Sequence, residues 1–339
     1  MSELAIGLVG CGGHARRHVS VVDDSPSARF VGCADVDVEA ARAFADEHGI
    51  PAAHDSLESL VDSTAPDALI VAAVPTAHPA LLETAIDRGV DAILCEKPMV
   101  VPGRGERARE IRTLAEEADA LVIEGLMYRH HPQIQRALEL VEDGAIGDVR
   151  YVYGQFSDYY NPDPDNWRND EDLGGGAMGA KGCYLVDACN AFAGADPVEA
   201  VCRETRDERF DVEIGQTGTV VYENGVTAQF ETNHRSVWRE ELKVCGTEGT
   251  IVVPHAIVTT TQTREIEIQL GGAYEVEDRE VETISFEPVD SYERQFENFV
   301  SCLRGEADPV VSLQETVANY ELTDALVRST ETDRVEPVR

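Results

Sequence analysis

Short apolar runs alternate with amphipathic stretches along the first third of this chain. Nearly uninterrupted apolar residues occupy positions 4–9, 30–34, 68–73, 92–95 and 121–124. Such runs are expected for strands that are covered on both faces. The stretches between them have helical spacing, and the one at 38–48 ends at Gly49, a common helix C-terminal residue. Strands and helices that alternate in this way predict a parallel sheet with helices on both faces.

The pattern changes after residue 124. We expect helices at 132–142, from the glycines 174–176 to about 192, at 290–304 and at 313–329. Strand-like segments fall at 149–157, 198–206, 217–223, 226–234, 241–246, 249–253, 264–270 and 279–286, and a polar loop at 158–173. Asn224-Gly225 is a typical hairpin turn. We therefore predict two domains, residues 1–124 and residues 125–339, the second an α+β domain with a large, mostly antiparallel open sheet.

Acidic residues dominate the charge of the whole chain. Asp and Glu number 64 against 28 Lys and Arg, for a formal net charge of −36. The excess is spread over both predicted domains without an acidic block, which disfavours a local acidic patch or tail. Self-repulsion of this size is screened in molar salt, where the Debye length is about 3 Å. We therefore expect a salt-adapted protein whose unfolding midpoint rises with KCl, and no nucleic-acid partner, since no basic stripe is present.

Apolar runs and cysteines bear on the compartment. No apolar run approaches the roughly 18 residues of a membrane span. Residues 1–4 lead into a strand pattern without a basic start, so we expect neither an export signal nor a membrane partner. The eight cysteines are scattered without a CxxC pair, which favours reduced thiols in a cytoplasmic protein and predicts no metal site.

A glycine-rich turn follows the first predicted strand. Gly10, Gly12 and Ala15 match GxGxxA, and Asp35 lies 20 residues after Ala15 at the end of the next strand. This is the dinucleotide-binding fingerprint in its strand–turn–helix context. Gly10 allows the tight turn, and Gly12 lets the backbone approach the pyrophosphate, which the helix N-terminus attracts. A structural turn without a ligand is the alternative.

Asp35 bears on the choice of dinucleotide. Its carboxylate can accept hydrogen bonds from the ribose hydroxyls and would repel a 2′-phosphate, and Val36 and Asp37 offer no cation to receive one. We therefore predict NAD as the preferred cofactor, with NADP as the alternative. His78 could contact the cofactor, or it could lie exposed in the first turn of a helix without a functional contact. The candidate cofactor-binding residues are Gly10, Gly12, Gly13, His14, Asp35, Val36, Ala73, Val74, His78, Glu96 and Lys97.

Lysine is rare in this chain, which contains only Lys97, Lys181 and Lys243 beside 25 arginines. An ammonium is a compact charge whose pKa shifts readily on burial, unlike that of a guanidinium. Lys97 follows the apolar run 92–95, and ligands of parallel sheets bind beyond the carboxyl ends of the strands. We therefore expect Lys97 to act at the bound dinucleotide.

These motifs, taken in order, resemble the Gfo/Idh/MocA (glucose–fructose oxidoreductase / inositol dehydrogenase) family over essentially the whole chain. They are GCGGHA at 10–15, Val74-Pro75 with His78, Glu96-Lys97-Pro98, Tyr128-Arg129 with Pro132, Gly144-Ala145-Ile146-Gly147, Trp167-Arg168, Gly174-Gly175-Gly176-Ala177, the 246–250 turn and the 292–299 helix. The resemblance implies a Rossmann domain followed by an α/β domain that acts on a hydroxyl of a sugar or polyol. It places Lys97 at the nicotinamide and substrate, and implies a homodimer or homotetramer formed through the C-terminal sheet.

A second family motif, commonly DxGxH, aligns with residues 180–184, which read Ala180-Lys181-Gly182-Cys183-Tyr184. Tyrosine in place of histidine resembles the branch that contains aldose dehydrogenases and dihydrodiol dehydrogenase. Alanine at the aspartate position fits neither branch. Tyrosine titrates at about 10, and an adjacent cation lowers that pKa, so we expect Tyr184 to be the acid/base group and Lys97 to tune it.

Further substrate contacts are expected around Tyr184. Lys181 is spaced i, i+3 from it and could replace the missing acid as a hydroxyl ligand; a solvated lysine is the alternative. Trp167 and Arg168 could cover a sugar, or Trp167 could simply anchor the loop. Arg129 is a further candidate that could brace the cleft. The candidate substrate-binding residues are Lys97, Arg129, Trp167, Arg168, Lys181 and Tyr184.

The sequence thus predicts an NAD(P)-dependent dehydrogenase that oxidises a hydroxyl of an aldose or polyol. A bound-cofactor aldose–ketose oxidoreductase and a redox-neutral, NAD-dependent glycosidase are alternative enzymes. A non-catalytic dinucleotide-binding sensor is a further alternative, which the missing acid at Ala180 permits and the presence of Lys97 and Tyr184 disfavours.

Overall fold

The structure is a computed structural model that describes residues 3–160, 163–164, 166–258, 263–271 and 280–339. The chain forms two compact units, each made of two segments. The first unit comprises Met1–Met127 and Tyr292–Val317, and the second comprises Tyr128–Ser291 and Ala318–Arg339. Each unit has its own sheet, and the two are described separately below.

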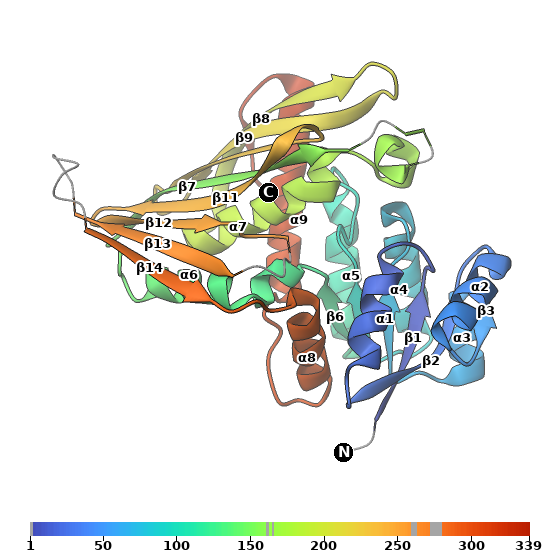
Figure 1. Ribbon diagram of the computed structural model, residues 1–339. Helices are drawn as coiled ribbons and strands as arrows, with labels where there is room; N and C mark the ends of the chain where they lie inside the picture. The colour runs from blue at the N-terminus through green and yellow to red at the C-terminus, as the bar shows by residue number, and fades with distance from the viewer. Residues whose placement is uncertain (1–2, 161–162, 165, 259–262, 272–279) are drawn as a thin grey trace. The chain divides into compact units, whose positions relative to one another are not determined.

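In the first unit, six strands form a parallel sheet with the order β3-β2-β1-β4-β5-β6 (Figure 1). The elements are β1 (Leu4–Val9), α1 (Ala15–Asp23), β2 (Ala28–Ala34), α2 (Val38–His48), β3 (Ala53–His54), α3 (Leu57–Thr64), β4 (Ala68–Val71), α4 (His78–Asp87), β5 (Ala92–Cys95), α5 (Gly105–Ala118) and β6 (Leu121–Glu124). This strand order is that of the Rossmann fold, so the predicted doubly wound parallel sheet is confirmed.

Helix α8 (Ser291–Leu303), distant in sequence, completes the core of the first unit. Its residues Phe296, Phe299 and Val300 are buried in the same hydrophobic cluster as Ile6 on β1 and Ile70 on β4. Each large apolar side chain removed from water contributes roughly 1.5–3 kcal/mol. The burial of three α8 side chains in this cluster explains why the segment from Tyr292 folds with the N-terminal residues.

In the second unit, nine strands form a mixed sheet with the order β14-β13-β12-β11-β7-β10-β9-β8-β15. The strands are β7 (Val149–Tyr159), β8 (Pro197–Asp207), β9 (Val212–Tyr222), β10 (Thr227–Asn233), β11 (Arg235–Gly246), β12 (Gly249–Pro254), β13 (Arg264–Leu270), β14 (Glu280–Phe286) and β15 (Glu336–Pro337). β7 and β10 pair in parallel and the other neighbours are antiparallel. The predicted large, mostly antiparallel sheet is confirmed.

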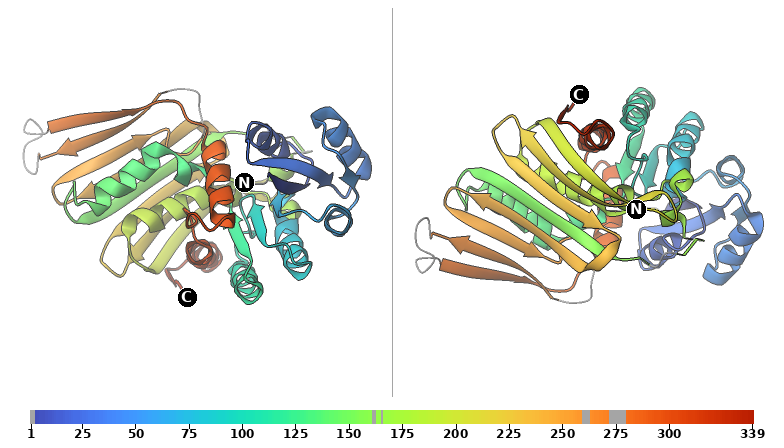
Figure 2. Two further views of the ribbon diagram at one scale, coloured as in Figure 1. Left: turned by 90° about the horizontal axis from the view of Figure 1, so that it is seen from below. Right: turned by 90° about the horizontal axis from the view of Figure 1, so that it is seen from above.

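Helices cover one face of this second sheet (Figure 2). α7 (Cys183–Ala193) lies against β7 and β10, and α6 (Pro132–Glu142) lies against β12 and β13. A π-helical turn, Met178–Gly182, leads directly into α7, and α9 (Leu313–Thr332) runs from the first unit into the second. π-turns are rare and occur frequently at functional sites.

Sequence patterns missed the shortest elements. β3 and β15 have two residues each, which leaves no periodicity to detect. Helix α3 has a recognisable start, because Ser56 caps it by accepting a hydrogen bond from the Ser59 amide. Of the predicted regions, residue 279 of the last strand, residues 161, 162 and 165 of the loop, and residues 1–2 lie outside the described residues.

Three further observations concern the described part of the chain. No helix in it is both long and apolar enough to cross a membrane. No group of three or more His, Cys, Asp or Glu side chains in it is placed to hold a metal ion. All eight cysteines lie in it as free thiols.

Candidate active site

The glycine-rich turn after β1 has the geometry that a bound dinucleotide needs. Gly10 has a φ of +93°, and a Cβ there would lie 2.7 Å from the backbone of Ala72 and Ala73, so only glycine fits. At Gly12 and Gly13, by contrast, a Cβ would meet nothing within 4 Å. The turn is therefore packed against the sheet on one side and has open space at its second and third glycines.

The N-terminus of α1 follows this turn and has no side-chain cap. His14 at the N-cap makes no capping hydrogen bond, and the first turn contains no acidic residue. The first amides of a helix have no partner within it, and together with the helix dipole they attract anions. These features fit the pyrophosphate of a dinucleotide.

Asp35, at the end of β2, lies beside the same turn. One carboxylate oxygen, Oδ2, accepts a hydrogen bond of 2.9 Å from the Cys11 amide, and Oδ1 accepts one of 3.0 Å from the Asp37 amide. Each oxygen has a second lone pair that can accept a ribose hydroxyl. The neighbouring Val36 is 98% exposed, and no cation stands in the sequence at 35–37.

The Glu96-Lys97-Pro98 segment leaves β5 through a buried ionic contact. Glu96 Oε1 lies 2.8 Å from Nε2 of His18, and both side chains are buried. Burial alone would raise the pKa of Glu96, but the His18 hydrogen bond and the nearby charges of His18, His14 and Lys97 outweigh it and lower the pKa to about 2. Its Oε2 also accepts a hydrogen bond from the Lys97 amide, so Glu96 fixes the backbone at Lys97. Lys97 itself is half-buried.

His78 joins two of the expected cofactor-binding segments. The residue is fully buried, with Nδ1 2.9 Å from the Pro98 carbonyl oxygen and Nε2 3.0 Å from that of Ala73. Burial lowers the pKa of the imidazole, and its neutral form donates to one of the two carbonyls. The His78 side chain therefore holds the ends of β4 and β5 together, and a cofactor contact through it stays a prediction. Val74 follows Ala73 as a half-buried residue.

In the second unit, the glycine triplet allows close packing around the π-turn. A Cβ on Gly175 would lie 2.7 Å from the carbonyl oxygens of Trp167, Arg168 and Asp170. Gly176 has a φ of +113°, and a Cβ there would lie 3.0 Å from the Glu213 carboxylate. Glycines at these positions bring the Trp167–Arg168 segment against the start of the helix that carries Lys181 and Tyr184.

Tyr184 lies in the first turn of α7 and is 4% exposed. Its ring meets that of Tyr128 edge to face at 5.7 Å and that of Phe156 at 6.2 Å between centroids. One turn further, Asp187 accepts hydrogen bonds from the hydroxyl of Tyr128 and from Arg129 at 3.1 Å. The pair Arg129–Asp187 thus braces the phenol-bearing helix, and a role of Arg129 in bracing the cleft stays a prediction.

Asn319 of α9 donates a third hydrogen bond to Asp187, at 2.9 Å. The Asp187 carboxylate is buried, and its three donors satisfy it with a buried cation among them. Sequence reasoning missed Asp187, although its spacing of i+3 from Tyr184 places the two residues on one helix face.

Lys181 is buried and forms an ion pair with Asp158 of β7. Its Nζ also lies over the ring of Tyr160, 4.2 Å from the centroid. The Arg168 guanidinium lies 5.0 Å from the Tyr160 ring and 4.6 Å from the Trp167 ring. The structure therefore brings Lys181, Trp167 and Arg168 into one cluster. Lys181 is only 1% exposed, so it is not the solvated lysine that was the alternative.

Glu213 on β9 is a second buried acid near the π-turn. Its Oε2 accepts a hydrogen bond of 2.9 Å from the Met178 amide, while Oε1 has no hydrogen-bond partner among the described residues. Burial raises its pKa to about 7, against the lowering effect of the Met178 and Ala177 amides. Glu213 therefore caps the helix that carries Lys181 and Tyr184.

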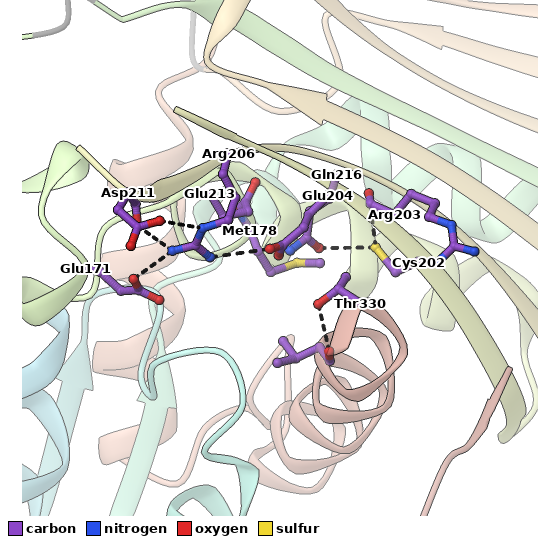
Figure 3. Close-up of polar contacts among 11 residues, drawn as sticks. Glu171, Met178, Cys202, Arg203, Glu204, Arg206, Asp211, Glu213, Gln216 and Thr330 are labelled. Atoms are coloured by element: carbon purple, nitrogen blue, oxygen red, sulfur yellow. Dashed lines mark hydrogen bonds and ion pairs between the residues drawn. The ribbon is translucent and has the colours of Figure 1, made fainter. Parts of the chain in front are cut away.

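Figure 3 shows an ion cluster beside Met178 and Glu213 that ties the surrounding loop to the sheet. Arg206 of β8 contacts Glu171 at 2.9 Å, Asp211 at 3.2 Å and Glu204 at 3.3 Å. Because these side chains are partly exposed, each pair contributes little by itself. Their effect is to connect the segment after Arg168 with β8 and the start of β9.

Each unit thus gathers its own share of the predicted site residues. The first unit brings together the glycine turn, Asp35 and, through His78, the Ala73 and Pro98 backbone. The second brings Tyr184, Lys181, Trp167 and Arg168 near one another, with Arg129 behind the helix. A meeting of Lys97 with Tyr184 stays a prediction, since these two residues belong to different units. Asp158 is a neighbour that sequence reasoning missed, because the predicted strand ends at residue 157 whereas β7 continues to Tyr159.

Comparisons with known proteins identify the family of this chain. A family model described as the oxidoreductase family with an NAD-binding Rossmann fold matches residues 4–126, and one described as the GFO/IDH/MocA C-terminal domain matches residues 134–252. D-xylose 1-dehydrogenase (NADP(+)) 2 of Haloferax volcanii is 31% identical over 331 residues, which are 97% of this chain and 98% of that protein. D-xylose 1-dehydrogenase [NADP(+)] of Haloarcula marismortui is 28% identical and covers 98% of this chain and 88% of its own.

The fold also agrees with that of solved structures. Aldose-aldose oxidoreductase from Caulobacter crescentus, complexed with glycerol, superposes with a TM-score of 0.86 at 21% identity, over 99% of this chain and all of that one. The two family models follow one another along the chain, and the Haloferax relative matches it from end to end. This chain therefore belongs to the GFO/IDH/MocA family and is an NAD(P)-dependent oxidoreductase.

Proposed function

We propose that the protein is a dehydrogenase that oxidises a hydroxyl of an aldose sugar or polyol. The observation that carries this proposal is the cluster around Tyr184, in which a phenol, an ammonium, a carboxylate, a guanidinium and aromatic rings lie together in the second unit. Such a mixture of hydroxyl-binding groups and flat apolar surfaces suits a polyhydroxylated ring. Two relatives named as D-xylose 1-dehydrogenases give further support.

In this proposal Tyr184 is the acid/base group and Lys97 assists it. Bound nicotinamide supplies the hydride acceptor for the carbinol carbon. Tyr184 takes up the hydroxyl proton at its phenolic oxygen, and the Lys97 ammonium favours the phenolate and donates a hydrogen bond to the reacting oxygen. The Tyr128 ring and the Asp187 network hold the Tyr184 helix in position.

We further propose NAD as the preferred dinucleotide. Asp35 is held beside the glycine turn by the Cys11 amide, where its remaining lone pairs suit two ribose hydroxyls and its charge opposes a 2′-phosphate. Val36 and Asp37 supply no cation that would offset this repulsion. Both xylose dehydrogenase relatives are named for NADP(+), so a direct comparison of the two nucleotides is needed.

The remaining expectations enter as parts of the same proposal. Residues 1–124 would bind the dinucleotide, and residues 125–339 the substrate and a second copy of the chain through the large sheet. The net charge of −36 supports a cytoplasmic, salt-adapted protein.

The test is the formation of reduced nicotinamide in molar KCl with D-xylose, L-arabinose, D-glucose, xylitol and myo-inositol, each with NAD+ and with NADP+. We expect turnover of at least one sugar or polyol, with a kcat/KM higher for NAD+ than for NADP+. Product formed without net reduction would favour the redox-neutral or bound-cofactor alternatives. No product from any combination would contradict the proposal, and a preference for NADP+ would contradict only the role given to Asp35.

A further inference from the structure

The ion pair between Lys181 and Asp158 is largely buried, and a contribution to stability alone does not explain why charged residues occupy these positions. The Lys181 side chain is 2% exposed and that of Asp158 is 16% exposed. Removing an ammonium and a carboxylate from water costs several kcal/mol per ion, and apolar residues of similar volume are often as stable or more stable. The more accessible member of the pair is the carboxylate.

Asp158 shares a strand face with the residues around Tyr184. Side chains alternate along a strand, so Phe156 and Asp158 point to one face of β7, and Tyr160 follows directly after the strand. The Phe156 ring contacts Tyr184, with 6.2 Å between centroids, and lies 5.7 Å from Lys181 Nζ. Asp158 is the next residue on that face, about 7 Å further along the strand.

The helix itself offers no acid at this place. Ala180, four residues before Tyr184, lies on the same helix face and has no polar side-chain atom. The Lys181 ammonium next to it is already engaged by Asp158 and lies over the Tyr160 ring. A hydroxyl that approaches this face therefore finds a carboxylate oxygen from β7, beside two aromatic rings.

We propose that Asp158 is a specificity-determining residue that accepts a hydrogen bond from a substrate hydroxyl next to the one oxidised at Tyr184. Lys181 is its positioning residue. The inference deepens the proposed function and depends on it: the substrate is a molecule with at least two neighbouring hydroxyls, such as a 1,2-diol unit of an aldose or polyol. A single isolated alcohol cannot form this additional hydrogen bond with the carboxylate.

The experiment compares D-xylose with its 2-deoxy, 3-deoxy and 4-deoxy analogues in wild type, Asp158→Ala and Asp158→Asn. In wild type, loss of the contacted hydroxyl should lower kcat/KM by about 100-fold, because a hydrogen bond to a charged carboxylate is then lost. Asp158→Ala should lower kcat/KM for D-xylose by a similar factor and should no longer distinguish D-xylose from that analogue. Asp158→Asn keeps the volume and one acceptor, and should show a smaller loss.

A merely structural role predicts a different result. If Asp158 only supported the fold, Asp158→Ala would lower the rates for D-xylose and all its analogues by the same factor, and that outcome would overturn the proposal. Asp148→Ala is the matched control, because Asp148 adjoins the other end of β7 and pairs with the exposed Arg150 at 3.1 Å. It should leave hydroxyl selectivity unchanged.

Lys181→Met tests the positioning role separately. It removes the ammonium but keeps an unbranched chain, and should raise KM for D-xylose by about 10-fold or more while the Kd for NAD+ stays within about twofold. Lys181→Met alone leaves the Asp158 carboxylate without its cation, which lowers the free energy of unfolding. In the double variant Lys181→Met, Asp158→Asn this unpaired charge is gone. The free energy of unfolding should therefore recover, while selectivity between D-xylose and its deoxy analogues should not. Recovery of both would overturn the assignment of Asp158.

Binding is measured beside turnover so that the two proposals fail separately. The shift of the thermal unfolding midpoint by xylitol, in the presence of NAD+, registers binding even where no sugar is oxidised. A shift that is present in wild type and lost in Asp158→Ala, without turnover of any sugar, would overturn the proposed reaction alone. Turnover or a xylitol shift that Asp158→Ala retains in full would overturn the role of Asp158 alone, and absence of both in wild type would overturn both proposals.

Discussion

Two glycine-led helices carry the candidate chemistry of this protein, and they use their glycines in opposite ways. Before α1, Gly12 and Gly13 face open space, and the helix N-terminus has neither a capping side chain nor an acidic residue. Before α7, Gly175 fits among three carbonyl oxygens, and the buried Glu213 caps the π-turn.

The difference shows what each helix is for. An open, uncapped N-terminus can receive an anionic ligand on its backbone amides, so we expect the first helix to act through its main chain. A closed, carboxylate-capped N-terminus has no such capacity. In the proposed function, the second helix therefore acts through its side chains, Lys181 and Tyr184, and the glycines serve to hold these in a fixed place.

The largest effect that we predict concerns Lys97, which we propose assists Tyr184 on α7. Lys97→Ala should lower kcat by about 10³-fold or more, because the phenolate of Tyr184 then loses its cation and the reacting oxygen loses a donor. The Kd for NAD+ should change by only a few fold. Steady-state kinetics and NADH fluorescence titration measure the two quantities.

Lys243→Ala is the matched control for Lys97, since Lys243 is the remaining lysine of the chain and lies within β11. Its kcat should equal that of wild type. Turnover near the wild-type rate in Lys97→Ala would mean that the ammonium at the end of β5 does not serve the phenol on α7, and the two helices would then need separate functional explanations.

The next largest effect concerns the cap of the second helix. The pKa of Glu213 is raised from 4.5 to about 7, so the folded protein binds its proton more tightly than the unfolded chain does. The contribution to stability is therefore unchanged below about pH 4.5, becomes more unfavourable as pH rises towards 7, and is constant above that. The total loss is about 3 kcal/mol at 1.36 kcal/mol per pKa unit.

Glu213→Gln should remove this loss while keeping an amide oxygen for the Met178 hydrogen bond. Its free energy of unfolding, measured in urea in molar KCl, should exceed that of wild type increasingly from pH 5 to pH 8. Glu199→Gln, which changes an exposed carboxylate on β8, should leave the pH dependence unchanged. Parallel curves for wild type and Glu213→Gln would contradict a buried acid with a raised pKa.

The sequence predicts a site well when the residues of that site lie close together in the chain, and poorly when they lie far apart. The parts of the first site are local signals, since Gly10, Gly12 and Ala15 form one short motif and Asp35 follows at the end of the next strand. The second site depends on contacts across the sheet. Lys181 meets Asp158 from 23 residues earlier, and Met178 meets Glu213 from 35 residues later.

Such pairings depend on strand register, which the sequence does not display. The alternation along 149–157 predicts a strand, but not that it continues to Tyr159 and places Asp158 beside Lys181. The π-turn at Met178–Gly182 is also absent from any 3.6-residue pattern, although it sets the direction of Lys181. The fold and the motif residues were therefore predictable, and the partners of those residues were not.

The smallest effect tests the contrast between the glycines directly. At Gly175 a Cβ would lie 2.7 Å from three backbone carbonyl oxygens, which cannot all retreat, so Gly175→Ala should lower the free energy of unfolding by about 2 kcal/mol. At Gly12 a Cβ meets no protein atom within 4 Å, so Gly12→Ala should leave stability within about 0.5 kcal/mol of wild type.

Cofactor binding should show the reverse order. Gly12→Ala places a methyl group where the pyrophosphate is expected to approach the backbone, and should raise the Kd for NAD+ by about 10-fold, or 1.4 kcal/mol. Gly175→Ala, in protein that remains folded in molar KCl, should bind NAD+ with the wild-type Kd. Urea unfolding gives the free energy of unfolding of each variant, and NADH fluorescence titration gives its dinucleotide affinity. If Gly12→Ala destabilised the fold as much as Gly175→Ala did, or bound NAD+ as wild type does, the first glycines would be packing residues like the second, and the open N-terminus of α1 would lose its assignment as the anion site.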